Sequence, residues 1–272
     1  MNTLIIRNLS KSFGSHKVIN DISFAVPENC VFGFIGANGA GKTTTMKMIL
    51  GLLKADGGEI SVCGEGVRFG ATKTNRLIGY LPDVPEFYNY MRPKEYLRLC
   101  GEIVGLDDQT IKSRSSELLE LVGLSDANKK IGSFSRGMKQ RLGMAQALLS
   151  EPKLLICDEP TSALDPWGRK EVLEILQQIK GKTTVIFSTH ILSDVERICD
   201  RVAVLHKGNI VLESAMSDLK FQCSKSKTIT LEFEQEVDSE KVLGALQRSN
   251  LAPVRYETAD VSIEDLFLEV AQ

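Results

Sequence analysis

The segment that most constrains the fold is residues 36–43, Gly-Ala-Asn-Gly-Ala-Gly-Lys-Thr, which fits G-x-x-x-x-G-K-[ST] at every position. An apolar run at 31–35 precedes it, and a helix can begin near Lys42. Glycines let the backbone curl so that its N–H groups point at phosphate oxygens, and a helix start adds partial positive charge. This strand–loop–helix context predicts a phosphate-binding loop, which we favour over a glycine-rich turn without a ligand.

Two side chains of this loop can act on a nucleoside triphosphate. Lys42 is expected to reach the β- and γ-phosphates, and Thr43 is expected to supply a hydroxyl to Mg²⁺. The expected nucleotide-binding residues of the loop are Gly36, Asn38, Gly39, Ala40, Gly41, Lys42, Thr43 and Thr44.

A second apolar run, at 154–157, ends in Asp158 and Glu159. Mg²⁺ prefers few carboxylates and keeps its waters, so Asp158 is expected to hold the ion through water. Glu159 stands where a carboxylate can orient or deprotonate an attacking water. Without the phosphate loop, the pair would be interpreted as two solvated acids at a strand tip. With the loop, the two acids predict hydrolysis of a nucleoside triphosphate.

Residues 135–140, Ser-Arg-Gly-Met-Lys-Gln, precede a stretch with helical apolar spacing. At such a helix start, Ser135 and Gly137 would offer a hydroxyl and backbone N–H groups to an anion. An ordinary serine cap explains the segment equally well on its own.

The order of these segments resembles the nucleotide-binding subunit of ABC transporters over residues 1–213. The family's Walker A motif matches residues 36–43, and its Walker B motif matches residues 154–159. Its signature motif, usually L-S-G-G-Q, falls on residues 134–138, and its D-loop, S-A-L-D, is present at 162–165.

The resemblance implies roles for further residues. His190 would be the switch histidine that acts with Glu159, and Phe13 would stack on adenine, a contact worth about 1–3 kcal/mol. Two such subunits face each other head to tail in this family, so Asp165 would cross the interface. The signature residues that would contact the partner's nucleotide are Ser135, Arg136, Gly137 and Met138.

Three positions depart from the family's pattern. Asp83 stands where a glutamine is usual, and Arg136 and Met138 replace a glycine and the glutamine of the signature. Asp83 could still reach Mg²⁺ through water, so it belongs to the expected metal residues with Thr43 and Asp158. Its negative charge would oppose the phosphates.

The fold class that we expect is α/β: a P-loop NTPase core with a β-rich N-terminal part, an inserted helical subdomain and a small α+β C-terminal extension. The nucleotide-binding domain would cover residues 1–213, with the helical subdomain at about 86–150 and the extension at 214–272. Expected strands lie at 4–6, 22–26, 31–35, 59–63, 77–81, 154–157, 184–188, 202–205, 210–212 and 228–233, and helices near 42–51, from 165, around 242–246 and over 263–270.

The aromatic residues of segment 85–91 leave two interpretations open. Phe87, Tyr88 and Tyr90 follow Asp83 closely and could form a groove that receives a helix of a permease. They could as well belong to the core of the helical subdomain, because aromatic side chains serve both cores and interfaces.

Composition limits the partners. A net charge of −2 gives no reason to expect nucleic-acid binding. The six cysteines form no Cys-x-x-Cys pair, which favours reduced thiols acting as small hydrophobic residues. No stretch approaches the ~20 apolar residues that span a bilayer, so work at a membrane would need another chain.

The resemblance therefore implies an ATPase that uses ATP and Mg²⁺ as a homodimer or as half of a heterodimer. It would power a separate multi-span permease from the cytoplasmic face of the membrane. The signature form Phe-Ser-Arg-Gly-Met-Lys-Gln-Arg and the acidic C-terminal region suggest the branch of bacitracin-type and sodium-type exporters. The alternatives are a soluble ABC ATPase that acts as an assembly or regulatory switch, and a nucleotide sensor without hydrolysis, which Glu159 and His190 argue against.

Overall fold

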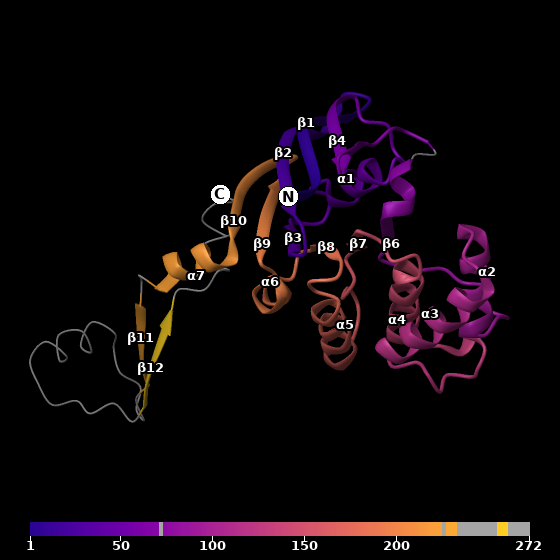
Figure 1. Cartoon of the computed structure of the whole chain (residues 1–272). Helices are drawn as coiled ribbons and strands as arrows, with labels where there is room; N and C mark the ends of the chain where they lie inside the picture. Colours follow the sequence, from indigo (N-terminus) through magenta and orange to yellow (C-terminus); the bar gives the residue numbers. More distant parts are fainter. Residues whose placement is uncertain (71–72, 225–226, 233–254, 261–272) are drawn as a thin grey trace, which may run out of the picture. The chain divides into compact units, whose positions relative to one another are not determined.

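The computed structural model describes residues 1–70, 73–224, 227–232 and 255–260, and side chains up to residue 221. The chain divides into two compact units, Met1–Met216 and Ser217–Gln272. Figure 1 shows the elements along the chain. The first unit contains β1 (Asn2–Phe13), β2 (His16–Pro27), β3 (Val31–Ile35), α1 (Lys42–Ile49), β4 (Gly57–Val62), β5 (Glu65–Gly66), the 3₁₀ turn η1 (Lys73–Leu77), β6 (Ile78–Leu81), α2 (Pro93–Val104), α3 (Asp108–Leu121), the 3₁₀ turn η2 (Ile131–Ser133), α4 (Arg136–Leu148), β7 (Leu154–Asp158), α5 (Pro166–Gln178), β8 (Thr184–Thr189), α6 (Leu192–Ile198), β9 (Arg201–His206) and β10 (Asn209–Ala215).

A six-stranded sheet forms the centre of this unit, with strand order β10-β9-β3-β8-β7-β6. The strands from β9 to β6 are parallel, and β10 is antiparallel to β9. Strands β3 and β7 are buried on both faces of the sheet. Their sequences are therefore nearly continuous apolar runs, as is typical of parallel strands. Because β3, β8 and β7 are neighbours, the three segments that follow them emerge at one edge of the sheet.

A second, antiparallel sheet has the order β2-β1-β4-β5. Its strand β2 packs on the central sheet through Phe24, whose ring stacks on Phe32 at 5.7 Å and on Phe34 at 5.3 Å. Helix α1 joins the same core through the buried Met46 and Ile49. In Figure 1, α5 and α6 lie on the opposite side of the central sheet from β1, β2 and β4.

The hairpin of β1 and β2 is longer than the runs expected at 4–6 and 22–26. Each strand has 12 residues, and their pairing continues to Phe13 and His16 through several register shifts. Each shift interrupts the alternation of buried and exposed residues, so the apolar pattern stops while the ladder continues. The short β5 was not expected.

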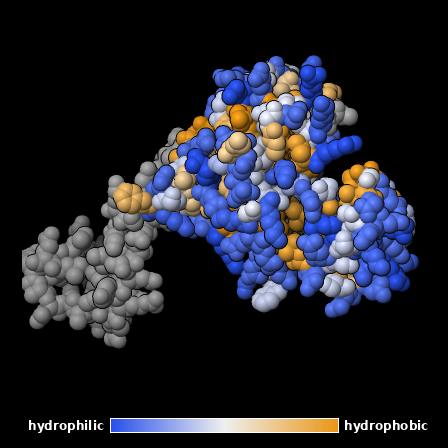
Figure 2. All heavy atoms as spheres, in the orientation of Figure 1, coloured by the Kyte–Doolittle hydropathy of each residue, from blue (hydrophilic) through white to orange (hydrophobic). Residues whose placement is uncertain are grey.

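The helices α2, α3 and α4 form a subdomain inserted between β6 and β7. Tyr96 on α2 donates a hydrogen bond to Gln146 on α4 at 2.9 Å. Phe87 packs edge to face on Tyr96, with centroids 5.0 Å apart. Tyr88 and Tyr90 are 53% and 65% exposed, so Phe87 contributes to packing within the subdomain while the two tyrosines lie at its surface. Figure 2 shows a hydrophobic patch on the surface of this subdomain.

The second unit contains β11 (Lys227–Glu232) and β12 (Arg255–Asp260), which pair antiparallel from Lys227↔Asp260 to Glu232↔Arg255. Helix α7 (Met216–Ser224) begins at the last residue of the first unit, and its other residues belong to the second unit. The strand expected at 228–233 corresponds to β11, and β12 was not expected. The helices expected around 242–246 and over 263–270 lie outside the described residues. None of the helices in the described ranges combines the length and apolarity that a membrane crossing requires.

Candidate active site

A cavity of about 360 Å³ opens at the carboxyl edge of β3, β7 and β8. Many of the residues for which the sequence predicts a chemical role line it, because parallel strands end at the same edge of a sheet. The lining residues are Val18, Asn38, Gly39, Gly41, Lys42, Thr43, Thr44, Asp83, Asp158, Glu159, Ser162 and His190. Gly36 and Ala40 belong to the same loop without lining this cavity.

The loop between β3 and α1 requires glycine at two positions for steric reasons. A Cβ on Gly36 would lie 2.6 Å from the carbonyl oxygen of Leu205. Gly41 caps α1 with φ at 111°, in the left-handed region that other residues rarely adopt. The start of α1 therefore presents its backbone N–H groups to the cavity, as an anion site requires.

Lys42 is buried at the floor of the loop, where its ammonium group contacts three oxygens. It donates hydrogen bonds to the carbonyls of Gly36 at 2.6 Å and Ala37 at 3.2 Å. Its Nζ also lies 3.0 Å from Oε1 of Glu159, an ion pair without hydrogen-bond geometry. The positive charge is thus satisfied within the chain, and it lies beside the loop that would hold a phosphate.

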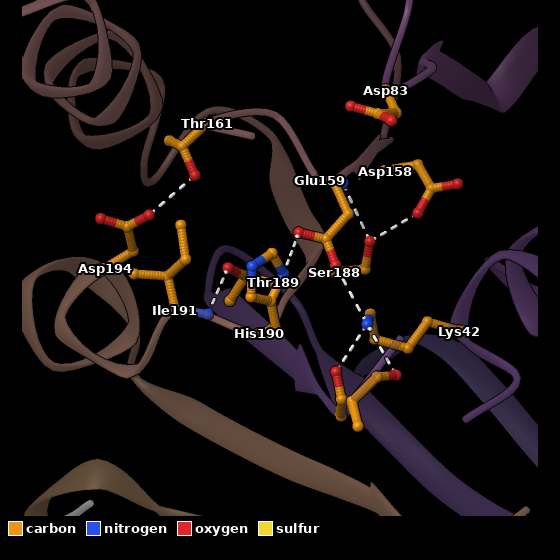
Figure 3. A network of polar contacts seen from close by, with 12 residues as sticks. Lys42, Asp83, Asp158, Glu159, Thr161, Ser188, Thr189, His190, Ile191 and Asp194 are labelled. Carbon is orange, nitrogen blue, oxygen red and sulfur yellow. Dashed lines mark hydrogen bonds and ion pairs between the residues drawn. The ribbon is translucent and has the colours of Figure 1, made fainter. Parts of the chain in front are cut away.

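Asp158 is buried at the end of β7 and accepts two hydroxyl hydrogen bonds. Thr43 donates to one carboxylate oxygen at 2.8 Å, and Ser188 donates to the other at 2.6 Å. The same Ser188 hydroxyl accepts a hydrogen bond from the backbone N–H of Glu159 at 2.9 Å. A single residue on β8 therefore fixes both acids, as Figure 3 shows.

The carboxylate of Glu159 lies between Lys42 and His190, and its side chain is 13% exposed. One carboxylate oxygen faces Lys42, and the other lies 3.0 Å from Nδ1 of His190. The backbone of Glu159 has φ at 47°, a conformation that costs about 1–3 kcal/mol for a non-glycine residue and is often found at functional sites. The strained turn and the Ser188 hydrogen bond hold this carboxylate over the cavity.

Asp83 lines the cavity from the segment after β6. It forms an ion pair with Arg136, with Oδ1 and a guanidinium nitrogen 3.3 Å apart. Partial burial raises the pKa of the Asp83 carboxyl above its usual value, against the lowering effect of Arg136, and the nearby charges of Asp158 and Glu159 raise it further. The carboxylate therefore sits in a negative environment that Arg136 partly compensates.

The remaining expected residues lie outside this cavity. Ser135 caps α4 by accepting a hydrogen bond from the N–H of Met138 at 3.2 Å, and Gly137 has open space where a side chain would start. Asp165 caps α5 and accepts a hydrogen bond from the N–H of Gly168 at 2.6 Å. Phe13, at the end of β1, is 51% exposed, with the ammonium of Lys11 5.4 Å from its centroid.

Asp194 on α6 is not among the residues that the sequence predicts for the site. The residue is 1% exposed, and its carboxylate accepts hydrogen bonds from Thr161 at 2.7 Å and from Arg169 at 2.6 Å. The Thr161 contact ties the turn after Glu159 to the helix that follows His190, as Figure 3 shows. The Arg169 contact ties α5 to the same helix. The sequence shows only an acid four residues after His190, and nothing in its neighbourhood distinguishes it from an acid on the solvated face of a helix.

Comparison with known proteins gives the family. The profile of the family described as ABC transporter matches residues 19–162. The chain is 38% identical to the uncharacterized ABC transporter ATP-binding protein YxlF of Bacillus subtilis (strain 168), over 98% of this chain and 99% of that protein. It is 39% identical to the bacitracin transport ATP-binding protein BcrA of Bacillus licheniformis, over 88% of this chain and 81% of that protein.

A solved structure described as the ATP binding subunit of an ABC transporter matches with a TM-score of 0.76 at 30% identity, over 99% of this chain and all of that one. The expectations of the P-loop NTPase fold and of an ATP-binding subunit are thereby confirmed. The chain belongs to the ABC transporter family, as one of its ATP-binding, ATP-hydrolysing subunits.

Proposed function

We propose that two copies of this chain hydrolyse ATP with Mg²⁺ at two shared sites and thereby drive export through a separate permease. The observation that carries the proposal is the meeting of Lys42, Glu159 and His190 at the carboxyl edge of the central sheet. A phosphate-binding lysine, a carboxylate able to activate water and a histidine beside it are the groups that attack on a γ-phosphate needs.

In this proposal Lys42 leaves Glu159 for the β- and γ-phosphates, because a phosphate carries more negative charge than a carboxylate. Glu159, still in contact with His190, then orients and deprotonates the attacking water. The water oxygen bonds to the γ-phosphorus while its proton moves to the Glu159 carboxylate, and the bond between the γ-phosphorus and the bridging oxygen breaks, so that ADP leaves with the electron pair. The exposed Phe13 would stack on the adenine.

The donors around Thr43 suit Mg²⁺. Thr43 and Asp158 offer a hydroxyl and a carboxylate 2.8 Å apart, and Mg²⁺ favours such oxygen ligands together with waters and phosphate oxygens. Within the described part of the chain, no group of three or more His, Cys, Asp or Glu could hold a metal without a nucleotide. Thr43 and Asp158 would hold the ion, with Asp83 reaching it through water, and the bound ion would neutralise charge on the phosphates.

We propose a dimer of identical chains because this chain carries both halves of a shared site. Ser135 and Gly137 are exposed or accessible at the start of α4 and do not line the cavity of their own chain. In a head-to-tail dimer they would meet the γ-phosphate held by the partner, and Asp165 would reach across. Each ATP would then bridge two subunits, and its hydrolysis would remove the bridge.

The permease is proposed from the family assignment, and it would hold this chain at the cytoplasmic face of the membrane. BcrA is named for bacitracin transport, and the form of the signature motif supports export as the direction. The surface tyrosines Tyr88 and Tyr90, which follow Asp83 closely, are the proposed contact with a permease helix. A pull-down from solubilised membranes that recovers only soluble proteins would favour the alternative, a soluble ABC switch ATPase.

Replacing Glu159 by glutamine tests the catalytic role. Since a positioned general base contributes about 10²–10⁴-fold, the Glu159→Gln variant should lose at least about a hundredfold in phosphate release while it still binds ATP. It should also elute as a dimer when ATP is present. The matched control is Glu174→Gln, the same change on the exposed side of α5, which should retain activity. Undiminished hydrolysis by the Glu159→Gln variant would refute the assignment.

A further inference from the structure

Two of the departures from the family's pattern meet in one contact. Asp83 replaces the usual glutamine and Arg136 replaces a signature glycine, and their side chains form an ion pair at 3.3 Å across 53 positions of sequence. Two substitutions that would each be unfavourable alone, a carboxylate near phosphates and a long cation in a glycine-rich motif, thus compensate each other.

The two ends of this ion pair belong to different functional elements. Asp83 lines the nucleotide cavity together with Asp158 and Glu159. Arg136 is the first residue of α4, between the Ser135 cap and Gly137. In the proposed dimer, the first element serves the subunit's own ATP and the second serves the ATP of its partner. The ion pair therefore connects the two sites through one subunit.

The ion pair between Asp83 and Arg136 is exposed to solvent and weak enough to be replaced by a stronger contact. Both side chains are 45% exposed, and such pairs contribute only about 0–1 kcal/mol because water and salt screen them. A γ-phosphate is a stronger acceptor for the Arg136 guanidinium than Asp83 is here, because it carries more charge and can accept bidentate hydrogen bonds, whereas Asp83 accepts a single one. A phosphate brought to the start of α4 would therefore displace Asp83.

From these contacts we infer that Arg136 exchanges Asp83 for the γ-phosphate of the partner's ATP when the dimer closes. This inference rests on the proposed head-to-tail dimer. The exchange takes the Arg136 cation away from Asp83 in its own site at the moment when the subunit engages the other site. The two sites are thereby coupled, and the coupling is reciprocal.

The test is a double-mutant cycle in the Glu159→Gln background, where ATP is retained. Sedimentation measures the dimer fraction as a function of ATP concentration at constant excess Mg²⁺. The fluorescence of Trp167 gives a second signal, because it is the single tryptophan in the sequence and lies two residues after Asp165. Asp83→Gln removes the competing carboxylate, so dimers should form at about two- to fivefold lower ATP concentration. Arg136→Gln, which keeps helix propensity, removes the phosphate contact and should raise that concentration at least about tenfold.

The combination of the two changes decides the mechanism. In the Arg136→Gln background, Asp83→Gln should have a clearly smaller effect, because no guanidinium is left to release. An equal effect of Asp83→Gln in both backgrounds would show that it acts through the metal alone and would overturn the exchange, as would no effect in either. Failure of Glu159→Gln itself to dimerise with ATP would instead remove the dimer of the proposed function. The matched control, Glu102→Gln, breaks the exposed pair with Arg98 in the same subdomain and should leave the curve unchanged.

Discussion

The buried contact between Arg169 and Asp194 makes a quantitative prediction about stability. The Asp194 side chain is 2% exposed and that of Arg169 is 30% exposed, with 2.6 Å between the carboxylate and Nε. The two partners therefore differ in what remains when the other is removed: an unpaired aspartate would stay in the interior, whereas an unpaired arginine has access to water. Substitutions at the two ends should thus have unequal effects.

Arg169→Met keeps an unbranched apolar stem and leaves the Asp194 charge with the Thr161 hydroxyl as its remaining side-chain donor. Removing one partner of a buried ion pair costs about 3–5 kcal/mol, and solvent access beside Arg169 favours the lower end, about 3 kcal/mol. Asp194→Asn keeps an acceptor for Arg169, and its amide can donate to the Thr161 hydroxyl, so its cost should be about 1 kcal/mol.

Thermal unfolding followed by far-ultraviolet circular dichroism measures the difference. At about 2–4 °C per kcal/mol for a chain of this size, Arg169→Met should lower Tm by about 6–12 °C and Asp194→Asn by about 2–4 °C. Arg98→Met is the matched control, since the side chain of Arg98 is 64% exposed and its ion pair with Glu102 lies on the surface. Its Tm should change by no more than about 4 °C.

The reasoning predicts that Arg169→Met lowers Tm more than Asp194→Asn or the surface control does. If Asp194→Asn lowers Tm as much as Arg169→Met does, or if Arg169→Met matches the surface control, the uncompensated buried carboxylate is not the dominant cost.

Three further predictions concern separate parts of the first unit. Lys42→Ala should weaken ATP binding by about ten- to a hundredfold in a calorimetric titration, because a charge-assisted phosphate contact is lost; unchanged affinity would refute that role. Gly79→Ala should cost about 1–3 kcal/mol in urea unfolding, because the new Cβ would collide with the carbonyl of Ala147 on α4, and full stability would contradict that packing. Alkylation read by mass spectrometry should label the exposed Cys63 before the buried Cys157, whose thiol pKa burial raises strongly. Labelling of Cys63 should increase with pH because the thiolate is the reactive form, and partial desolvation together with the charge of Glu28 raises the pKa of this thiol, so the increase should continue above the usual range of a cysteine. Equal rates for the two thiols would contradict the burial order.

The sequence predicts local features of this fold well where one physical signal dominates. The apolar run before the phosphate loop gives β3 with its bounds, and Asp165-Pro166 gives the start and cap of α5. These features depend on residues within a few positions of each other, so periodicity and capping rules suffice.

Features that depend on distant residues could not be predicted in the same way. The Ser188 hydroxyl fixes Asp158 from 30 positions away, and Asp83 meets Arg136 only because the helical subdomain folds back beside β6. The departures at these two positions were visible in the sequence, but their pairing was not. A single sequence states which charges are present, whereas the tertiary fold decides which of them meet.

The ion pair between Lys42 and Glu159 gives this subunit an internal competitor for its own substrate. Any incoming triphosphate must displace the carboxylate, so part of the intrinsic affinity of the lysine is spent on that displacement. The same competition acts in reverse after hydrolysis, when the departing phosphate frees the lysine to take Glu159 back. Under the proposed function, such an enzyme resets itself: Glu159, the proposed activator of water, would also help to expel the product, and between turnovers the ion pair would hold it where it cannot act on water.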